Sequence, residues 1–283
     1  MRLNPFDTSK INVGTTGRAG KAGGVGCVTI ILAAAGALFF GVDPMQTIGI
    51  VEGVQQQSGS TQTPQDEDEQ AICTSNEYAS ETCAALTSLN ETWAQTFAQQ
   101  GIEFRQPSLR FVTSQRFQTG CGPASVGLGP FYCPANETIY IDTGFYDQLA
   151  QMSGEGGDFA RLYVVAHEYG HHIQTITGIS GQIRSVQNAN PGQANQLSVL
   201  MELQSDCYAG VWAGKNRDRL DTGDMREGLR AASAIGDDTL QRQSGRQADP
   251  ESFTHGSSEQ RQQALQLGLQ GDDRACDRIT QIG

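Results

Sequence analysis

The clearest pattern of apolar and polar residues covers residues 162–176, where apolar residues recur every three or four positions. This spacing predicts a helix with one stripe of apolar side chains turned toward a core. The stripe consists of Leu162, Val165, Ala166, Tyr169, Ile173 and Ile176. Gly178 is a stop signal, so we expect the helix to end just before it.

Weaker patterns on either side predict the remaining elements. Helical spacing favours helices around residues 84–97, 144–149, 200–211, 225–235 and 260–269. Short strands are expected at residues 102–104, 108–112 and 138–142. Between Cys121 and Pro134 the many Gly and Pro residues indicate a loop. The predicted fold class is therefore α+β, mostly helical with a small β-sheet.

The chain before residue 72 has a different composition. Residues 1–21 are Gly-rich and basic, with Asp7 as the one acid, which predicts a disordered arm. Residues 22–42 contain no charged side chain and are long enough to cross about 30 Å of hydrocarbon as one transmembrane helix. Residues 43–71 are rich in Gln, Ser and acids, which predicts a disordered tether. Residues 72–283 then form one folded domain.

Positive charge before the predicted transmembrane helix places the N-terminus in the cytoplasm and the folded domain across the membrane. Two alternatives for residues 22–42 remain open. A cleaved signal peptide has a shorter apolar region of about 7–15 residues and a small-residue cleavage site, whereas residues 41–44 are a poor cleavage site. A buried core helix would have nothing nearby in the sequence to pack on. We therefore favour a single-pass signal anchor.

Six of the seven cysteines follow the predicted membrane segment, and an even number there suits an oxidising compartment. Six cysteines allow fifteen connectivities. Short separations favour the pairs Cys73–Cys83 and Cys121–Cys133, which leaves Cys207–Cys276. Reduced, buried thiols are the alternative. The sequence contains no Cys-x-x-Cys, which argues against a structural zinc bound by cysteines.

Length and charge narrow the class of protein. With 283 residues, of which 37% are hydrophobic, the chain can bury one sizeable core. It carries 19 Lys and Arg against 31 Asp and Glu, a net charge of −12. This balance argues against nucleic acid as a partner.

The predicted helix at 162–176 carries the candidate chemistry. His167 and His171 are four residues apart, so both imidazoles can point at one zinc ion. With Glu168 they form the His-Glu-x-x-His pattern of zinc peptidases. Zinc lowers the pKa of a bound water from about 16 toward about 7, and Glu168 is placed to take its proton as general base. The alternative is a pair of buried, hydrogen-bonded histidines.

A second helix carries Glu202 and Asp206 four residues apart among apolar residues. Like charges at this spacing mildly destabilise a helix, so a nearby cation is expected. Glu202 would complete an open catalytic zinc site, with water in the fourth position. Asp206 can accept the free ring N–H of His167 or His171 and fix its tautomer. A solvated acidic face is the alternative.

The two other histidines have less defined roles. His172 lies on the flank of Glu168 and is not an expected ligand, so it either contacts substrate or is buried and hydrogen-bonded. His255 precedes a predicted helix that Ser257 can cap. It is a candidate for stabilising the oxyanion that forms during hydrolysis. An exposed loop histidine is the alternative.

With these residues in hand, the chain resembles the putative neutral zinc metallopeptidase family of bacterial membrane-anchored proteins from about Asn4 to the C-terminus. The matching segments are GPFYCP at 129–134, HEYGHH at 167–172, ELQSDCYAGVWA at 202–213, IGDD at 235–238 and FTHGSSEQR at 253–261. The metal site is also similar to that of thermolysin-like peptidases, or gluzincins, in which a Glu-x-x-x-Asp helix supplies the third ligand. This resemblance implies a zincin-like domain in which Glu202 is a zinc ligand and Asp206 supports the ligands.

We therefore expect a zinc-dependent peptidase with one Zn²⁺, anchored in the bacterial inner membrane with its catalytic domain outside the cytoplasm. Its expected substrate is a peptide or protein, cleaved by a zinc-activated water with Glu168 as base. One alternative is a non-catalytic zinc-binding scaffold for envelope partners, and another is a zinc hydrolase of a non-peptide amide. Nothing in the sequence indicates substrate preference or oligomeric state.

Overall fold

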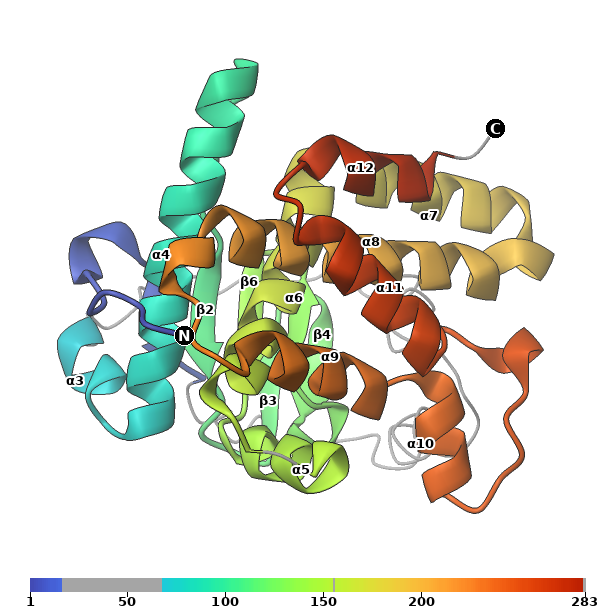
Figure 1. Cartoon of the computed structure of the whole chain (residues 1–283), viewed down its shortest axis with the longest axis horizontal. Coiled ribbons are helices and arrows are strands. Elements are labelled where there is room, and N and C mark those ends of the chain that lie inside the picture. Colours follow the sequence, from blue (N-terminus) through green and yellow to red (C-terminus); the bar gives the residue numbers. More distant parts are fainter. Residues whose placement is uncertain (17–67, 155, 282–283) are drawn as a thin grey trace, which may run out of the picture.

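The computed structural model describes residues 1–16, 68–154 and 156–281 (Figure 1). The predicted transmembrane helix at 22–42 and nearly all of the predicted tether lie outside these residues. Among the described residues, no helix combines the length and apolar character needed to cross a membrane. The described part is mostly helical with a small sheet, which confirms the predicted α+β class.

The main sheet has four strands in the order β1-β2-β6-β5. β1 (Val13–Thr15), β2 (Ser108–Phe111) and β6 (Thr138–Ile141) run parallel, and β5 (Phe131–Cys133) is antiparallel to β6. Leu109 pairs with Ile139 in the middle of the sheet, and both side chains are fully buried. β5 forms the edge of this sheet, so one side of its backbone is not paired with another strand of the described chain.

A short hairpin covers one face of the β5–β6 edge. Its strands are β3 (Arg116–Thr119) and β4 (Gly122–Ser125). Phe117 of the hairpin lies against Phe131 and Tyr140, with ring centroids 6.3 Å and 5.6 Å apart. The disulfide Cys121–Cys133 ties the hairpin turn to β5. The predicted loop at 121–134 therefore contains two short strands, β4 and β5, which pair with β3 and β6 and not with each other.

Helices make up the rest of the domain. They are α3 (Glu69–Cys73), α4 (Glu77–Gln100), α5 (Gly144–Ser153), α6 (Asp158–Ile176), α7 (Ile179–Ala189), α8 (Ala194–Lys215), α9 (Asp224–Ala234), α10 (Asp237–Gln243), α11 (Ser258–Gly268) and α12 (Asp273–Asp277). Single-turn 3₁₀ helices are η1 (Thr8–Lys10), η3 (Val126–Leu128), η4 (Pro191–Gln193), η5 (Arg217–Arg219), η6 (Pro250–Ser252) and η7 (Arg278–Thr280).

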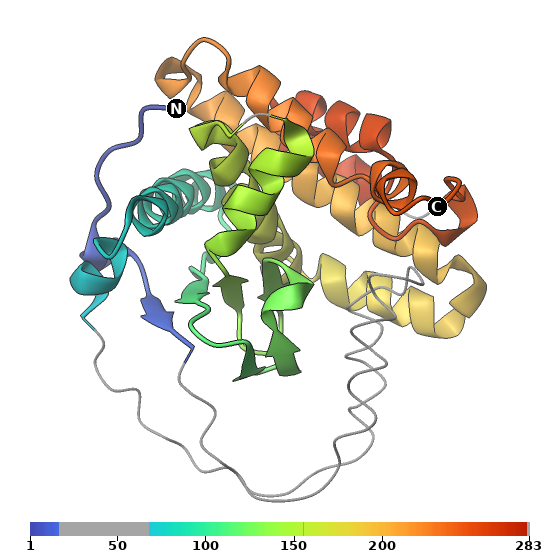
Figure 2. The same cartoon turned by 90° about the horizontal axis from the view of Figure 1, so that it is seen from below.

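α6 is the central helix, with the strands on one side and α8, α9 and α11 on the other (Figure 2). The predicted apolar stripe is buried, apart from the half-buried Ile176. The opposite face is buried as well, including His172 and Gln174. The helix ends at Ile176, and Gly178 follows with φ +80°, as the stop signal predicted.

Two glycines allow α8 and α11 to cross in close contact. A Cβ on Gly268 would overlap the carbonyl oxygen of Cys207, and a Cβ on Gly210 would overlap that of Leu265. Larger side chains would force the two helices apart. This crossing holds α11, with its buried Arg261, against the acidic face of α8.

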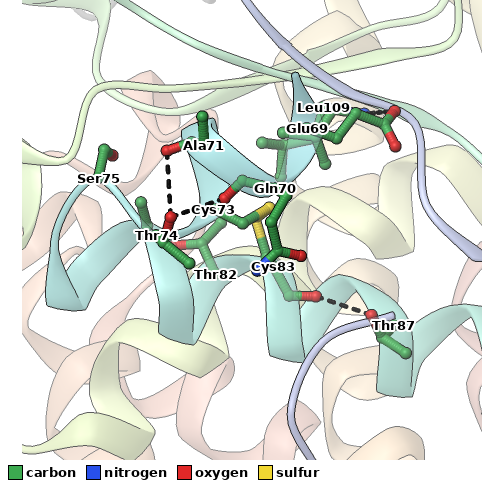
Figure 3. Close-up of a disulfide and its surroundings, with 12 residues drawn as sticks. Glu69, Gln70, Ala71, Cys73, Thr74, Ser75, Thr82, Cys83, Thr87 and Leu109 are labelled. Carbon is green, nitrogen blue, oxygen red and sulfur yellow. Dashed lines mark hydrogen bonds between the residues drawn. A yellow bond between two sulfur atoms is a disulfide. The ribbon is translucent and has the colours of Figure 1, made fainter. Parts of the chain in front are cut away.

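All three predicted disulfides are present. Cys73–Cys83 joins α3 to α4 beside the hydrogen bond from the Thr87 hydroxyl to the Cys83 carbonyl (Figure 3). Cys121–Cys133 fastens the hairpin, and Cys207–Cys276 ties α8 to α12. The predicted connectivity is therefore confirmed: the two pairs that are close in sequence are bonded, and so is the remaining pair.

The prediction of a disordered arm is wrong for residues 1–16. Ile11 and Val13 are buried, β1 pairs with β2, and the Val13 amide donates to Glu69 Oε1 at 3.0 Å. Residues 1–16 and 68–281 therefore pack together in one domain. Polar composition predicted disorder, whereas the neighbouring strand β2 supplies the pairing partner.

The predicted strand at residues 102–104 is not formed. These residues form no regular secondary structure, and the Phe104 ring packs on Phe97 at a centroid distance of 5.6 Å. The apolar character that suggested a strand is therefore used for packing on the end of α4.

Candidate metal centre

The structure brings His167, His171 and Glu202 together. Glu202 Oε2 lies 3.1 Å from His167 Nε2, and Glu202 Oε1 lies 3.3 Å from His171 Nε2. One ligand atom from each of the three residues lies within 4.8 Å of the other two. The two imidazoles come from one turn of α6, and the carboxylate comes from α8.

Close packing of α6 on α8 places Glu202 opposite the histidines. A Cβ on Gly170 would overlap Ser205, so only glycine allows this approach. The Ser205 hydroxyl donates to the carbonyl oxygen of His167, which locks the register of the two helices. This local packing explains why a carboxylate 31 residues after His171 reaches the same point (202 − 171 = 31).

The His167 ring is oriented by a buried carboxylate. Asp206 Oδ1 accepts from His167 Nδ1 at 2.8 Å, so Nδ1 carries the proton and Nε2 faces Glu202. Arg261 donates to both Asp206 oxygens, at 2.8 Å and 3.0 Å. The Tyr163 hydroxyl adds a third donor, at 2.5 Å from Oδ1. The two charged side chains, Asp206 and Arg261, are at most 2% exposed.

These neighbours shift the pKa values of the charged groups. Burial raises the pKa of Asp206, but Arg261 and His167 lower it by more, so the carboxyl stays ionised. Burial lowers the pKa of His167, but Asp206 and Glu202 outweigh burial and raise it to about 10. Zinc would have to displace this proton, because the ligand form of histidine is neutral.

The His171 ring is oriented by a neutral amide. Gln174 Oε1 lies 2.9 Å from His171 Nδ1, and an amide oxygen can only accept. His171 therefore carries a proton on Nδ1, and its Nε2 faces Glu202. Both histidines present the same nitrogen to the same point.

This donor set fits zinc. Zinc in catalytic sites takes three protein ligands from imidazole nitrogens and a carboxylate oxygen, and each ligating histidine donates its other ring N–H to an acceptor. His167, His171 and Glu202 supply that set, and Asp206 and Gln174 supply the two acceptors. The six cysteines within the described residues are all in disulfides and are not available as ligands.

Glu168 follows His167 on α6 and is also buried. Burial raises the pKa of Glu168, while the two site histidines lower it and leave a net increase. A raised carboxyl pKa brings the group closer to the value that general acid and base catalysis needs near neutral pH.

His255 lies near this centre and is held by Asp237 at the start of α10. Asp237 Oδ1 is 3.1 Å from His255 Nδ1, and Asp237 Oδ2 accepts from the backbone amides of Thr254, His255 and Gly256. Burial lowers the pKa of His255, but Asp237 and the charge of Glu202 raise it to about 9. Its side chain is 35% exposed, so it is partly open to solvent. Ser257 caps α11 in a capping box, as predicted.

His172 points away from the ligand set. Its Nδ1 accepts from the Tyr132 hydroxyl at 3.1 Å, and its Nε2 donates to the Arg105 carbonyl at 2.6 Å. The ring is fully buried, and burial lowers its pKa. Both nitrogens are used, so the buried, hydrogen-bonded interpretation holds and His172 links α6 to β5.

Sequence reasoning missed four residues of this site: Tyr163, Gln174, Asp237 and Arg261. Gln174 follows His171 by three positions, so helical spacing alone could have placed it beside the ring. Asp237 and Arg261 lie inside the segments IGDD and FTHGSSEQR but carried no assigned role. Their contacts join α6 to helices far along the chain, which spacing does not reveal.

A family model and several relatives match this chain. A family model described as "Putative neutral zinc metallopeptidase" matches residues 6–279. The Escherichia coli K12 protein named "Uncharacterized protein YpfJ" is 41% identical over 265 residues, covering 92% of this chain and 87% of that protein. The Mycobacterium bovis protein named "Uncharacterized protein Mb2605" is 43% identical over 191 residues, covering 62% of this chain and 64% of that protein. No solved structure matches the chain.

Proposed function

The chain belongs to the putative neutral zinc metallopeptidase family, and on this premise we propose that it is a zinc-dependent peptidase that hydrolyses peptide bonds. One observation carries the proposal. The Nε2 atoms of His167 and His171 converge on the Glu202 carboxylate, and each ring has its Nδ1 atom hydrogen-bonded to an acceptor. A pair of merely structural histidines would have no need for this shared orientation.

His167, His171 and Glu202 would hold the ion. When bound, zinc supplies positive charge that lowers the pKa of water and polarises a carbonyl group. Glu168 takes a proton from the attacking water and returns it to the leaving amine. Its buried position and raised pKa suit both steps, because a group that accepts and then releases a proton needs a pKa near the working pH.

His255 is the proposed donor to the negative charge that develops on the carbonyl oxygen. Asp237 engages Nδ1 and keeps the ring protonated, which leaves Nε2 to donate. A fixed donor of this kind stabilises the transition state more than the ground state. Asp237 acts through His255 and is therefore a positioning residue.

An extended peptide is the substrate form that suits the neighbouring sheet. β5 is an edge strand, and its Tyr132 contacts His172, which directly follows the ligand His171. A peptide can add to such an edge through backbone hydrogen bonds, with its side chains in alternating pockets.

For location, we propose an extracytoplasmic domain attached to the bacterial inner membrane through residues 22–42. Three disulfides favour an oxidising compartment. We propose a single crossing with the N-terminus in the cytoplasm, and because β1 pairs with β2, this topology requires β1 to leave the sheet. Topology reporters fused at the two ends of the chain test whether these ends lie on opposite sides of the membrane or on the same side. Reporters on opposite sides require β1 to leave the sheet, and reporters on the same side exclude a single crossing.

The test uses the purified full-length chain, its Glu168→Gln variant and a Thr82→Val control. Thr82 bonds the Tyr146 hydroxyl in the core between α4 and α5, away from the metal centre. We expect all three proteins to bind one zinc each, and only the parent and the control to cleave an unbiased peptide library. Zinc binding without cleavage of any peptide would refute the peptidase and favour a scaffold or an amidase. Failure to bind zinc would refute the ligand assignment.

A further inference from the structure

Two buried glutamines connect the metal centre to the C-terminal segment of the chain. Gln174 and Gln204 are both 0% exposed. Gln174 Nε2 donates to Gln204 Oε1 at 3.0 Å, and Gln204 Nε2 donates to the Cys276 carbonyl at 3.3 Å and to Thr280 Oγ1 at 2.9 Å. Since Gln174 also accepts from His171, a continuous chain of hydrogen bonds runs from His171 to α12 and η7.

The direction of every bond in this chain is fixed. The Cys276 carbonyl can only accept, so the side-chain nitrogen Nε2 of Gln204 must face it, and the side-chain oxygen Oε1 of Gln204 must face Gln174. The Met201 carbonyl, 2.7 Å from Gln174 Nε2, fixes the second amide in the same way. The Gln174 oxygen is therefore turned to His171, which must carry its proton on Nδ1.

The far end of the chain of bonds is covalently anchored. Cys276, whose carbonyl accepts from Gln204, is joined by a disulfide to Cys207 on α8. Cys207 is three residues after Gln204 on that helix, so the disulfide holds the acceptor beside the glutamine that needs it. Without this link, only the main chain that follows α11 and noncovalent contacts would hold α12, a five-residue helix, against α8.

We propose that Gln174 and Gln204 form an amide relay that holds His171 in its zinc-binding tautomer, and that the disulfide-tied C-terminal segment 273–280 sets the zinc affinity through this relay. The inference rests on the zinc site of the proposed function, but it does not depend on peptidase activity. His167 differs, because an ionised carboxylate and an arginine orient its ring. The two histidines are thus oriented by separate parts of the chain.

The first test measures zinc affinity by competition with a chelator. Gln174→Met keeps the length of the side chain but removes the acceptor, and we expect zinc to bind about 10- to 100-fold more weakly. Gln204→Met leaves Gln174 its bond to the Met201 carbonyl, so we expect a smaller loss in the same direction. Thr82→Val removes a buried hydrogen bond elsewhere and should leave zinc affinity unchanged. Parent-like affinity in Gln174→Met would overturn the proposal.

The second test reads the tautomer directly. Nitrogen-15 NMR of zinc-free protein, at a pH high enough for the imidazole to be neutral, separates a protonated from an unprotonated ring nitrogen. We expect His171 to be protonated on Nδ1 in the parent and to become a mixture of tautomers in Gln174→Met. An unchanged tautomer would contradict the relay even if zinc affinity fell for another reason.

The third test concerns the anchor and remains informative if Gln174→Met fails to fold. Cys207→Ala with Cys276→Ala should weaken zinc binding, whereas Cys73→Ala with Cys83→Ala should not. Both pairs remove one buried disulfide, but the second joins α3 to α4, away from the relay. Equal zinc affinity in the two double variants would refute control by the C-terminal segment.

These readouts separate the relay from the proposed function. If the parent binds zinc and shows the relay effects but cleaves no peptide, the peptidase proposal fails and the relay stands. If the parent binds no zinc, the zinc site and the affinity part of the relay both fail. The tautomer measurement on zinc-free protein then decides whether the hydrogen-bond chain itself exists.

Discussion

Arg261→Met provides the sharpest test of the buried charge network behind His167. The variant keeps most of the apolar length of the side chain but removes the guanidinium that bonds both oxygens of the Asp206 carboxylate, which is 0% exposed. Removing one partner of a buried ion pair costs about 3–5 kcal/mol. For a domain of this size, 1 kcal/mol shifts Tm by about 2–4 °C, so we expect a drop of roughly 6–20 °C.

A second substitution should restore part of this loss. Asp206→Asn in the Arg261→Met background removes the buried carboxylate that has lost its guanidinium partner, while its amide oxygen can still accept from Tyr163 and His167. The double variant should therefore be more stable than Arg261→Met alone. Two independent destabilising substitutions would instead add their costs.

The assay is thermal and urea unfolding of zinc-stripped protein with its disulfides intact, followed by circular dichroism and tryptophan fluorescence. Coincident transitions establish that a single free energy of unfolding is defined. Arg161→Met is the matched control, because Arg161 also forms two bonds to one carboxylate, Glu81, but both side chains are partly exposed. Its cost should be about 1 kcal/mol or less. An Arg261→Met variant no less stable than this control would refute the reasoning.

Three further predictions follow from the metal centre and its surroundings. Asp237→Asn removes the carboxylate that raises the pKa of His255 to about 9, so the loss of kcat/KM at alkaline pH should move to lower pH; an unchanged profile would exclude His255 as the charged donor. Removing zinc with a chelator should lower the free energy of unfolding by about 2.7 kcal/mol relative to protein at zinc concentrations 100 times Kd, and equal unfolding curves would show that the native state does not bind the ion. Cys121→Ala with Cys133→Ala frees the hairpin from β5, so KM for peptides should rise while zinc affinity stays constant; a fall in zinc affinity with unchanged KM would contradict a substrate role for that edge.

Local spacing was sufficient to predict the ligand helix and two of the disulfides, and the third, Cys207–Cys276, followed by elimination. His167 and His171 lie on one helical turn whatever the rest of the fold does, and each close cysteine pair is confined to a short stretch of chain. The placement of Glu202 depended on the packing of α6 on α8, but its stacked partner Asp206 already suggested a nearby cation. The ligand helix and the two short-range disulfides could be predicted because each is determined by residues that are close together in the sequence.

The remaining features depend on contacts between distant segments. Arg261 reaches Asp206 across 55 positions, and Gln204 reaches Thr280 across 76. β1 has only three residues and no alternating pattern of its own, so its place in the sheet is set by β2. The polar composition of residues 1–16 predicted disorder because composition does not show that β2 has an unpaired edge to which β1 can bond.

The parallel pairing of β1 with β2 has a consequence for biosynthesis. Val13 pairs with Leu109, so β1 is made 96 residues before its partner (109 − 13 = 96). At about 5–20 residues per second, the ribosome takes roughly 5–20 s to cover that distance. Nascent chains of this protein therefore expose an unpaired strand for seconds, a period in which a chaperone or a second nascent chain can capture it.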